Sequence, residues 1–196
     1  MNIALRLFPA LLLGCLALPA SAQDTTSAAD TLSLGEPVEP ALGETYISET
    51  HGDWEIRCIT VEEGQFEPCQ MYQLLSDDEG NAVAEINIFD VPDEDTLTAG
   101  ATIVTPLDTL LTPGLRFAVD DGDQVRFPFS FCQQIGCFVR IGLTEDDLGS
   151  LRDGGVAAIT IVPLPAPDQE VSLEVSLSGF TAAFEDLASR SPSDDG

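Results

Sequence analysis

The sequence predicts an all-β protein, an antiparallel β-sandwich of about eight or nine short strands with one or two short helices. Apolar and polar residues alternate in many short runs, most regularly over 171–177, and this pattern is typical of strands with one buried face. Clusters of Gly, Pro, Asp and Ser separate the runs at the spacing found in sandwiches and barrels. Two antiparallel sheets packed face to face would bury all the apolar faces together.

The N-terminal segment 1–22 is predicted to be a secretory signal peptide. One cation, Arg6, precedes an apolar run over 7–18, and Ala20-Ser21-Ala22 offers a cleavage site. The run is too short to span a bilayer. A lipoprotein signal stays open as an alternative, because Leu12-Leu13-Gly14-Cys15 resembles a lipobox. Both signals predict an exported protein.

The rest of the chain divides into three parts. Residues 23–48 hold five acidic residues, no basic residue and no periodic pattern, so we expect a flexible acidic linker. Residues 49–188 contain all the predicted strands and form the β-sandwich domain, and 189–196 are a polar tail. No second apolar run approaches the length of a membrane span, so no integral membrane segment is expected.

The charge of the chain is strongly negative. Cleavage would remove Arg6 and leave six arginines and no lysine against 34 acidic residues. Such a surface repels nucleic acid and anionic lipid, so neither is expected as a partner. It would suit cationic partners, or serve solubility in a saline habitat.

The first half of the domain is predicted to be a three-strand meander. Its strands cover 54–58, 68–75 and 82–88, with turns at 62–66 and 76–81.

The middle of the domain is predicted to cross from one sheet to the other. An acidic loop over 91–100 leads to a short strand, 101–105. The apolar segment 106–115 contains two prolines and is therefore neither a regular helix nor a central strand, so we expect it to connect the two sheets. The next predicted strands are 115–119, 125–131 and 137–143.

The C-terminal part is predicted to hold both helices. Thr144 can cap a helix over 144–152, whose first turn is acidic, as the helix dipole favours. A strand over 156–162 and the regular strand 171–177 follow. Residues 179–187 are predicted to form a short terminal helix.

The cysteines predict two disulfides. Four cysteines remain after cleavage, and an even number in an exported chain is typical of disulfides. The expected pairs are Cys58 with Cys69 and Cys132 with Cys137, because each pair brackets a turn that contains a glycine. Each bond should add roughly 2–3 kcal/mol to the free energy of unfolding. A zinc site is not expected, since the cysteine spacing is wide and His51 is the only histidine.

A series of short motifs carries a family resemblance. In chain order they are Gly52-Asp53-Trp54, Arg57-Cys58, Cys69-Gln70-Met71, Pro106-Leu107, Pro113-Gly114-Leu115, Phe131-Cys132, Gly136-Cys137 and Ser176-Leu177-Ser178-Gly179-Phe180. With this order and spacing, residues 49–188 resemble the invasion-associated locus B family of exported proteins in Gram-negative bacteria. The resemblance implies a periplasmic or outer-membrane-associated location, a β-sandwich-like domain and no known enzymatic activity. Surface-binding members are often basic, so the lack of lysine argues against adhesion to anionic host surfaces.

No catalytic or cofactor-binding set is predicted. His51 has no Ser-His-Asp pattern around it, and the sequence shows no Cys-x-x-Cys, phosphate loop or dinucleotide-binding glycines. The acidic turns 77–80 and 120–123 offer oxygen ligands but do not fit a twelve-residue calcium loop, so no metal site is assigned there. Weak metal binding at these turns stays open.

Arg116, Arg126 and Arg140 are the candidate docking residues. Arg116 and Arg126 are symmetric about Asp121, so they should lie opposite each other on the outward face of a hairpin, and Arg140 has the outward position in the following strand. Like charges in direct opposition are unfavourable unless something lies between them. Acids on neighbouring strands are one explanation, and a docking spot for an anionic group of a partner is the other.

The leading hypothesis is an exported, disulfide-stabilised, non-enzymatic envelope protein that acts as a protein-binding or accessory module. Another envelope protein is the expected partner, because the edges of antiparallel sandwiches can accept a strand from a partner. One alternative is a host-interaction or adhesion factor. The other is a periplasmic enzyme with two carboxylates in a cleft, which would need neighbours that push their pKa values apart. The oligomeric state is not predicted.

Overall fold

The structure is a computed structural model that describes residues 35, 38–91 and 96–191. The predicted signal peptide lies outside the described residues, as do most of the predicted linker and the end of the predicted tail. Every described helix and strand belongs to one compact unit, Glu39–Gly196.

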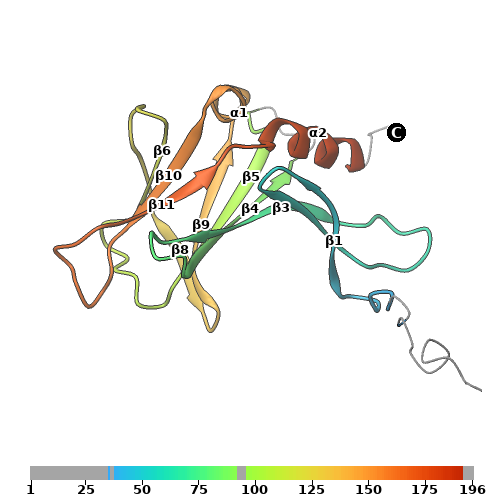
Figure 1. Cartoon of the computed structure of the whole chain (residues 1–196), viewed down its shortest axis with the longest axis horizontal. Coiled ribbons are helices and arrows are strands. Elements are labelled where there is room, and N and C mark those ends of the chain that lie inside the picture. The colour runs from blue at the N-terminus through green and yellow to red at the C-terminus, as the bar shows by residue number, and fades with distance from the viewer. Residues whose placement is uncertain (1–34, 36–37, 92–95, 192–196) are drawn as a thin grey trace, which may run out of the picture. The chain divides into compact units, whose positions relative to one another are not determined.

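Seven antiparallel strands form the larger sheet, in the order β1-β2-β3-β4-β5-β9-β8, and they can be followed in Figure 1. The bounds of these strands are β1 Thr45–His51, β2 Trp54–Ile59, β3 Cys69–Ser76, β4 Ala82–Asp90, β5 Ala99–Thr105, β8 Phe129–Gln133 and β9 Gly136–Leu143. Four antiparallel strands form the smaller sheet, in the order β11-β10-β6-β7. The bounds of these are β6 Leu115–Val119, β7 Val125–Phe127, β10 Val156–Ile161 and β11 Val171–Ser176.

The predicted all-β sandwich is confirmed, with eleven strands in the described residues and two helices, α1 Glu145–Asp153 and α2 Phe180–Arg190. The meander predicted over 54–88 is present as β2, β3 and β4. The apolar connection predicted over 106–115 does cross between the sheets, because it links β5 of the larger sheet to β6 of the smaller one.

Two of the eleven strands were not predicted from the sequence, and the first of these is β1. The boundary expected between residues 48 and 49 falls inside it, because pairing with β2 runs from Thr45↔Ile59 to His51↔Trp54. The register shifts between Ile47 and Glu49, as in a β-bulge. A bulge interrupts the alternation of buried and exposed residues, which explains why this segment showed no period of two.

The second additional strand comes from a split, and the single strand expected over 125–131 was wrong. β7 ends at Phe127 and pairs with β6, whereas β8 begins at Phe129 and pairs with β9 of the other sheet. Pro128 lies between the two strands. Because proline has no backbone N–H to donate to a ladder, the chain leaves one sheet here and enters the other.

The apolar core lies between the sheets and extends under α2. Fully buried side chains from both sheets and from α2 belong to one cluster. The Trp54 ring of β2 meets the Phe180 ring of α2 edge-on, with 5.6 Å between ring centroids, and its indole N–H donates to the Ser176 carbonyl at 2.9 Å. The buried Gln73 amide also joins the sheets, because it donates to the Ser176 carbonyl and accepts from the Ser176 N–H.

The two helices begin differently. Thr144 caps α1, as predicted: its hydroxyl accepts from the Asp147 N–H, and the Asp147 carboxylate accepts from the Thr144 N–H. α2 begins instead at Gly179, which has a left-handed backbone and no side chain to act as a cap. This glycine lies against the turn between β1 and β2, where the Asp53 N–H donates to the Ser178 carbonyl at 3.1 Å.

Candidate functional site

Both predicted disulfides are present, Cys58–Cys69 and Cys132–Cys137. Each joins two residues that are directly opposite in neighbouring antiparallel strands, β2 with β3 and β8 with β9. Cys58, Glu67 and Cys69 bring their ligand-type atoms close together. Because the two sulfur atoms are bonded to each other, they are not thiolates that could bind a metal ion.

A group of ordered side chains covers the outer face of β2 and β3. We call this group the outer platform, and it consists of Glu55, Arg57, Gln70, Tyr72 and Leu74. The Arg57 guanidinium lies 3.1 Å from the centroid of the Tyr72 ring, and its Nε donates to the Glu55 carboxylate at 2.8 Å. Helix α2 packs on the opposite face of these strands, where Trp54 meets Phe180.

Four residues of the outer platform, Glu55, Arg57, Tyr72 and Leu74, line a depression of about 430 Å³. Its lining is mostly polar and includes Asp53 and Glu174 beside the platform residues. Three carboxylates and one guanidinium therefore line the depression, since Glu55 and Arg57 belong to its lining as well. Of the three, Glu55 is bonded to Arg57, and Asp53 accepts from the Ser176 hydroxyl at 2.6 Å. Leu74 adds an apolar surface at the edge and is 52% exposed.

The platform side chains are held in place before any partner arrives. Gln70 donates to the Asn87 side chain of β4 at 2.9 Å, and Arg57 is fixed between Glu55 and the Tyr72 ring. Burial raises the pKa of the Tyr72 phenol, which is neutral at physiological pH. The depression is therefore a preformed polar surface with one cationic and several anionic groups.

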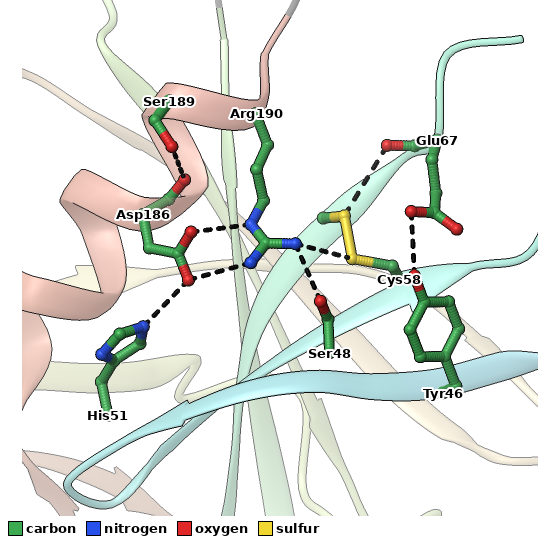
Figure 2. A network of polar contacts seen from close by, with 9 residues as sticks. Tyr46, Ser48, His51, Cys58, Glu67, Asp186, Ser189 and Arg190 are labelled. Carbon is green, nitrogen blue, oxygen red and sulfur yellow. Dashed lines mark hydrogen bonds and ion pairs between the residues drawn. A yellow bond between two sulfur atoms is a disulfide. The ribbon is translucent and has the colours of Figure 1, made fainter. Parts of the chain in front are cut away.

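A second polar network joins the end of α2 to β1 (Figure 2). Asp186 accepts from Arg190 Nε at 2.8 Å and lies 2.9 Å from His51 Nε2. Arg190 Nη1 also donates to the Ser48 hydroxyl at 2.8 Å and lies 3.9 Å from Cys58 Sγ. Figure 2 shows the guanidinium between the Asp186 carboxylate and the disulfide.

The hydrogen bonds of this network fix the charge of its members. The hydrogen bond from Arg190 lowers the pKa of the Asp186 carboxyl, with a further contribution from His51, so the group is an anion and a poor general acid. The same bond raises the pKa of Arg190. In the described residues, the polar contact of the His51 ring is with Asp186, and no nucleophilic hydroxyl or thiol completes a catalytic set.

The three arginines predicted for docking do not form one group. Arg116 and Arg126 lie directly opposite each other in β6 and β7, as predicted, whereas Arg140 belongs to β9 of the other sheet. Arg116 pairs with the Glu170 carboxylate at 2.6 Å, and Arg126 donates to the backbone carbonyls of Thr112 and Pro113. These contacts keep the two guanidinium groups satisfied within the chain, and their role in docking stays a prediction.

The two acidic turns use their carboxylates to hold the backbone. Asp77 accepts from the backbone N–H groups of Glu79 and Asn81, and hydrogen bonds from Asn81 lower the pKa of the Asp77 carboxyl. Asp120 accepts from the N–H groups of Gly155 and Val156. This is a structural use for both turns.

Sequence reasoning missed the outer platform, although one signal was available. The predicted disulfide places Cys58 opposite Cys69, and counting back along the antiparallel pair places Glu55 opposite Tyr72. Only the stacking of Arg57 on Tyr72 then requires the structure, because Arg57 lies directly opposite Gln70 and reaches the ring diagonally.

A comparison with family models decides the classification of the chain. Residues 54–188 match the model described as "Invasion associated locus B (IalB) protein", which is more than half of the sequence. The chain belongs to the IalB family. The match includes the outer platform and both disulfides, and the family is not a known enzyme family.

A solved structure supports the IalB classification. The chain is similar to the crystal structure of invasion associated protein B from Bartonella henselae, with 25% sequence identity and a TM-score of 0.61. The alignment covers 74% of this chain and 95% of the other. No curated protein matches the sequence.

A further property of this IalB protein bears on its place in the cell. Two disulfides in a member of this family indicate an exported envelope protein. Among the described residues, neither helix has the length and apolar character needed to cross a membrane.

Proposed function

We propose that this IalB protein is a non-enzymatic accessory protein of the cell envelope that binds another envelope protein through the outer platform. The preformed depression between the outer platform and the β11 residues Glu174 and Ser176 carries the proposal. Side chains that are already ordered lose little conformational freedom on binding, which favours affinity. Arginine and tyrosine are also the residue types that most often dominate interface energies.

The charges of the depression indicate what the partner presents. Asp53, Glu55 and Glu174 outnumber Arg57, so a basic side chain of the partner would be attracted. Leu74 at the edge would contact an apolar side chain next to that base. The expected partner segment therefore combines an arginine or lysine with an aliphatic or aromatic neighbour.

In-cell cross-linking with a tagged full-length chain tests the proposal. Leu74→Glu should remove most of the recurring cross-linked partner, because it places a further negative charge and no apolar surface at the edge of the depression. Leu164→Glu is the matched control, since Leu164 is 54% exposed and lies in a loop that does not line the depression. Partners are identified by mass spectrometry.

Equal partner recovery with Leu74→Glu and with the wild-type chain would contradict the proposal. Loss of the partner with both variants would also contradict it, because the effect would then not be specific to the outer platform. Digestion of intact cells by an external protease addresses the alternative of a host-interaction factor. A tag that is cleaved on intact cells would favour that alternative over an accessory role inside the envelope.

A further inference from the structure

A second cavity, separate from the outer platform, opens between the two sheets. Its volume is about 480 Å³. Its innermost lining includes the buried side chains of Trp54, Ile88 and Phe180, and its walls include Phe117 and Phe127 of the smaller sheet. The size and the apolar lining match those of small-molecule sites in proteins.

Acidic residues surround this apolar cavity. Asp120, Asp123, Asp147 and Asp153 all line it, and none of the residues that line it is basic. Asp120 accepts from the backbone N–H groups of Gly155 and Val156, and Asp147 belongs to the cap of α1.

Two of these carboxylates remain available. Asp123 and Asp153 are exposed, and neither carboxylate has a hydrogen bond or an ion pair with another residue that the structure describes. A ligand at the cavity therefore meets two unpaired anions at the edge and an apolar interior behind them. A carboxylate or phosphate head group would be repelled at this position, whereas a cation would be attracted.

We propose that the inter-sheet cavity binds a small cationic amphiphile. Its aliphatic or aromatic body occupies the apolar interior, and its ammonium or guanidinium head lies beside Asp123 and Asp153. This site is distinct from the outer platform, and its ligand class goes beyond the proposed function.

The position of the cavity favours a small molecule over a peptide segment. Among the strands that line the cavity, β4, β5, β6 and β9 are each paired on both sides within their sheets. Most of a peptide backbone inside it would therefore leave its own N–H and C=O groups without partners, which is costly. An alkyl or aryl group has no such groups to satisfy.

The test uses the fluorescence of Trp54, because it is the only tryptophan of the chain and lines the cavity. The full chain is titrated with octyltrimethylammonium, kept below its micelle concentration. Octanoate supplies the same tail with the opposite charge, and tetramethylammonium supplies the head alone. We expect a saturable change with octyltrimethylammonium and binding at least tenfold weaker with each of the other two probes.

Two pairs of substitutions test whether the charges of Asp123 and Asp153 contribute to the binding of octyltrimethylammonium. Asp123→Asn with Asp153→Asn should weaken binding of octyltrimethylammonium about fivefold to tenfold, whereas Asp78→Asn with Asp168→Asn should leave it unchanged. The control pair removes the same charge from exposed acids that do not line the cavity. The thermal midpoint of each variant confirms that it is folded.

Three outcomes would overturn the proposal. One is the absence of saturable binding of octyltrimethylammonium. Another is equal affinity for octanoate, and the third is an equal effect of the two substitution pairs. None of these outcomes depends on partner capture by the outer platform, so the two proposals fail or stand separately.

Discussion

At the scale of single residues, Asp186 attaches the last helix to the first strand. Its carboxylate is shared by Arg190 of the same helix and His51 at the end of β1, and its side chain is only 20% exposed. An ion pair that is partly removed from water and held by several hydrogen bonds contributes more than an exposed pair. The network in Figure 2 therefore stabilises the contact between α2 and β1.

We expect Asp186→Asn to lower the free energy of unfolding by roughly 1–2 kcal/mol at pH 7. The pKa of Asp186 is lowered in the folded protein, first by the hydrogen bond from Arg190. Its charge therefore contributes stability that is fully present above the unfolded pKa, about 3.9, and is lost as the pH falls through the lower folded pKa. Urea unfolding at pH 7, 5 and 3 should show the difference between variant and wild type shrinking below pH 4.

The control for this prediction is Asp168→Asn, which removes an exposed charge in a loop. It should change the free energy of unfolding by less than about 0.5 kcal/mol at every pH. A difference for Asp186→Asn that stays constant down to pH 3 would show that the carboxylate charge is not the cause.

The residue that lies opposite another in a hairpin could be predicted where the spacing from the turn decides it. The opposition of Arg116 and Arg126 followed from their symmetry about Asp121 and is confirmed. The ion pair of Arg116 with Glu170 was not predictable, because Glu170 reaches β6 from the loop before β11. Short-range spacing carries no information on contacts between segments so distant in sequence.

At the scale of elements, two glycines explain why the ends of the domain carry recognisable motifs. Gly52 follows β1 and Gly179 precedes α2, and both have positive φ, 58° and 83°. A Cβ on Gly179 would overlap the carbonyl of His51, and a Cβ on Gly52 would overlap the carbonyl of Ser178. The motifs at residues 52–54 and 176–180 are therefore two sides of one contact.

We expect Gly52→Ala and Gly179→Ala each to lower the free energy of unfolding by at least about 2 kcal/mol, since both strain and overlap oppose them. Gly149→Ala is the control, because Gly149 lies in α1 with nothing within 4 Å of an added Cβ. That variant should be more stable by roughly 0.5–1 kcal/mol. Thermal unfolding followed by circular dichroism measures all three, and equal effects would contradict this account.

Elements were predictable where the pattern is regular and short-range. The strands over 171–177 and 54–58 and the cap at Thr144 follow from alternation and capping preferences, and the structure confirms them. The bulge in β1 and the change of sheet at Pro128 were missed. Both interrupt a pattern at a point where contacts between strands decide the geometry.

At the scale of the whole molecule, net charge sets the response to salt. The formal charge of the sequence is −27. In the part of the chain that the structure describes, four arginines form ion pairs with carboxylates, but many of the acidic residues described there have no ion pair. Repulsion among the acids therefore outweighs attraction in the summed field.

We expect the midpoint of thermal unfolding to rise by roughly 3–5 °C between 20 mM and 500 mM sodium chloride, because ions screen repulsion in the folded state. Differential scanning calorimetry measures the midpoint, and potassium chloride should give the same rise. A midpoint that falls with salt would show that the ion pairs, rather than the repulsion, dominate.

The fold class and the family could be predicted from the sequence because they depend on the order of many weak signals. The outer platform and the inter-sheet cavity could not, since both consist of side chains from strands that meet only after folding. Trp54 illustrates the difference. The strand that contains it, 54–58, was expected from the sequence, while its place in the lining of a cavity depends on the distance between two sheets.

The contact between the first strand and the last helix also has a consequence for the order of folding. β1 and α2 are the first and the last described elements of the chain, and Asp186 and His51 are 135 positions apart in the sequence. The contact cannot form before the segment 180–190 has been added to the chain. Topologies with many such long-range pairings fold slowly. The N-terminal strand of this protein therefore stays unpaired with its helix until that late segment is available.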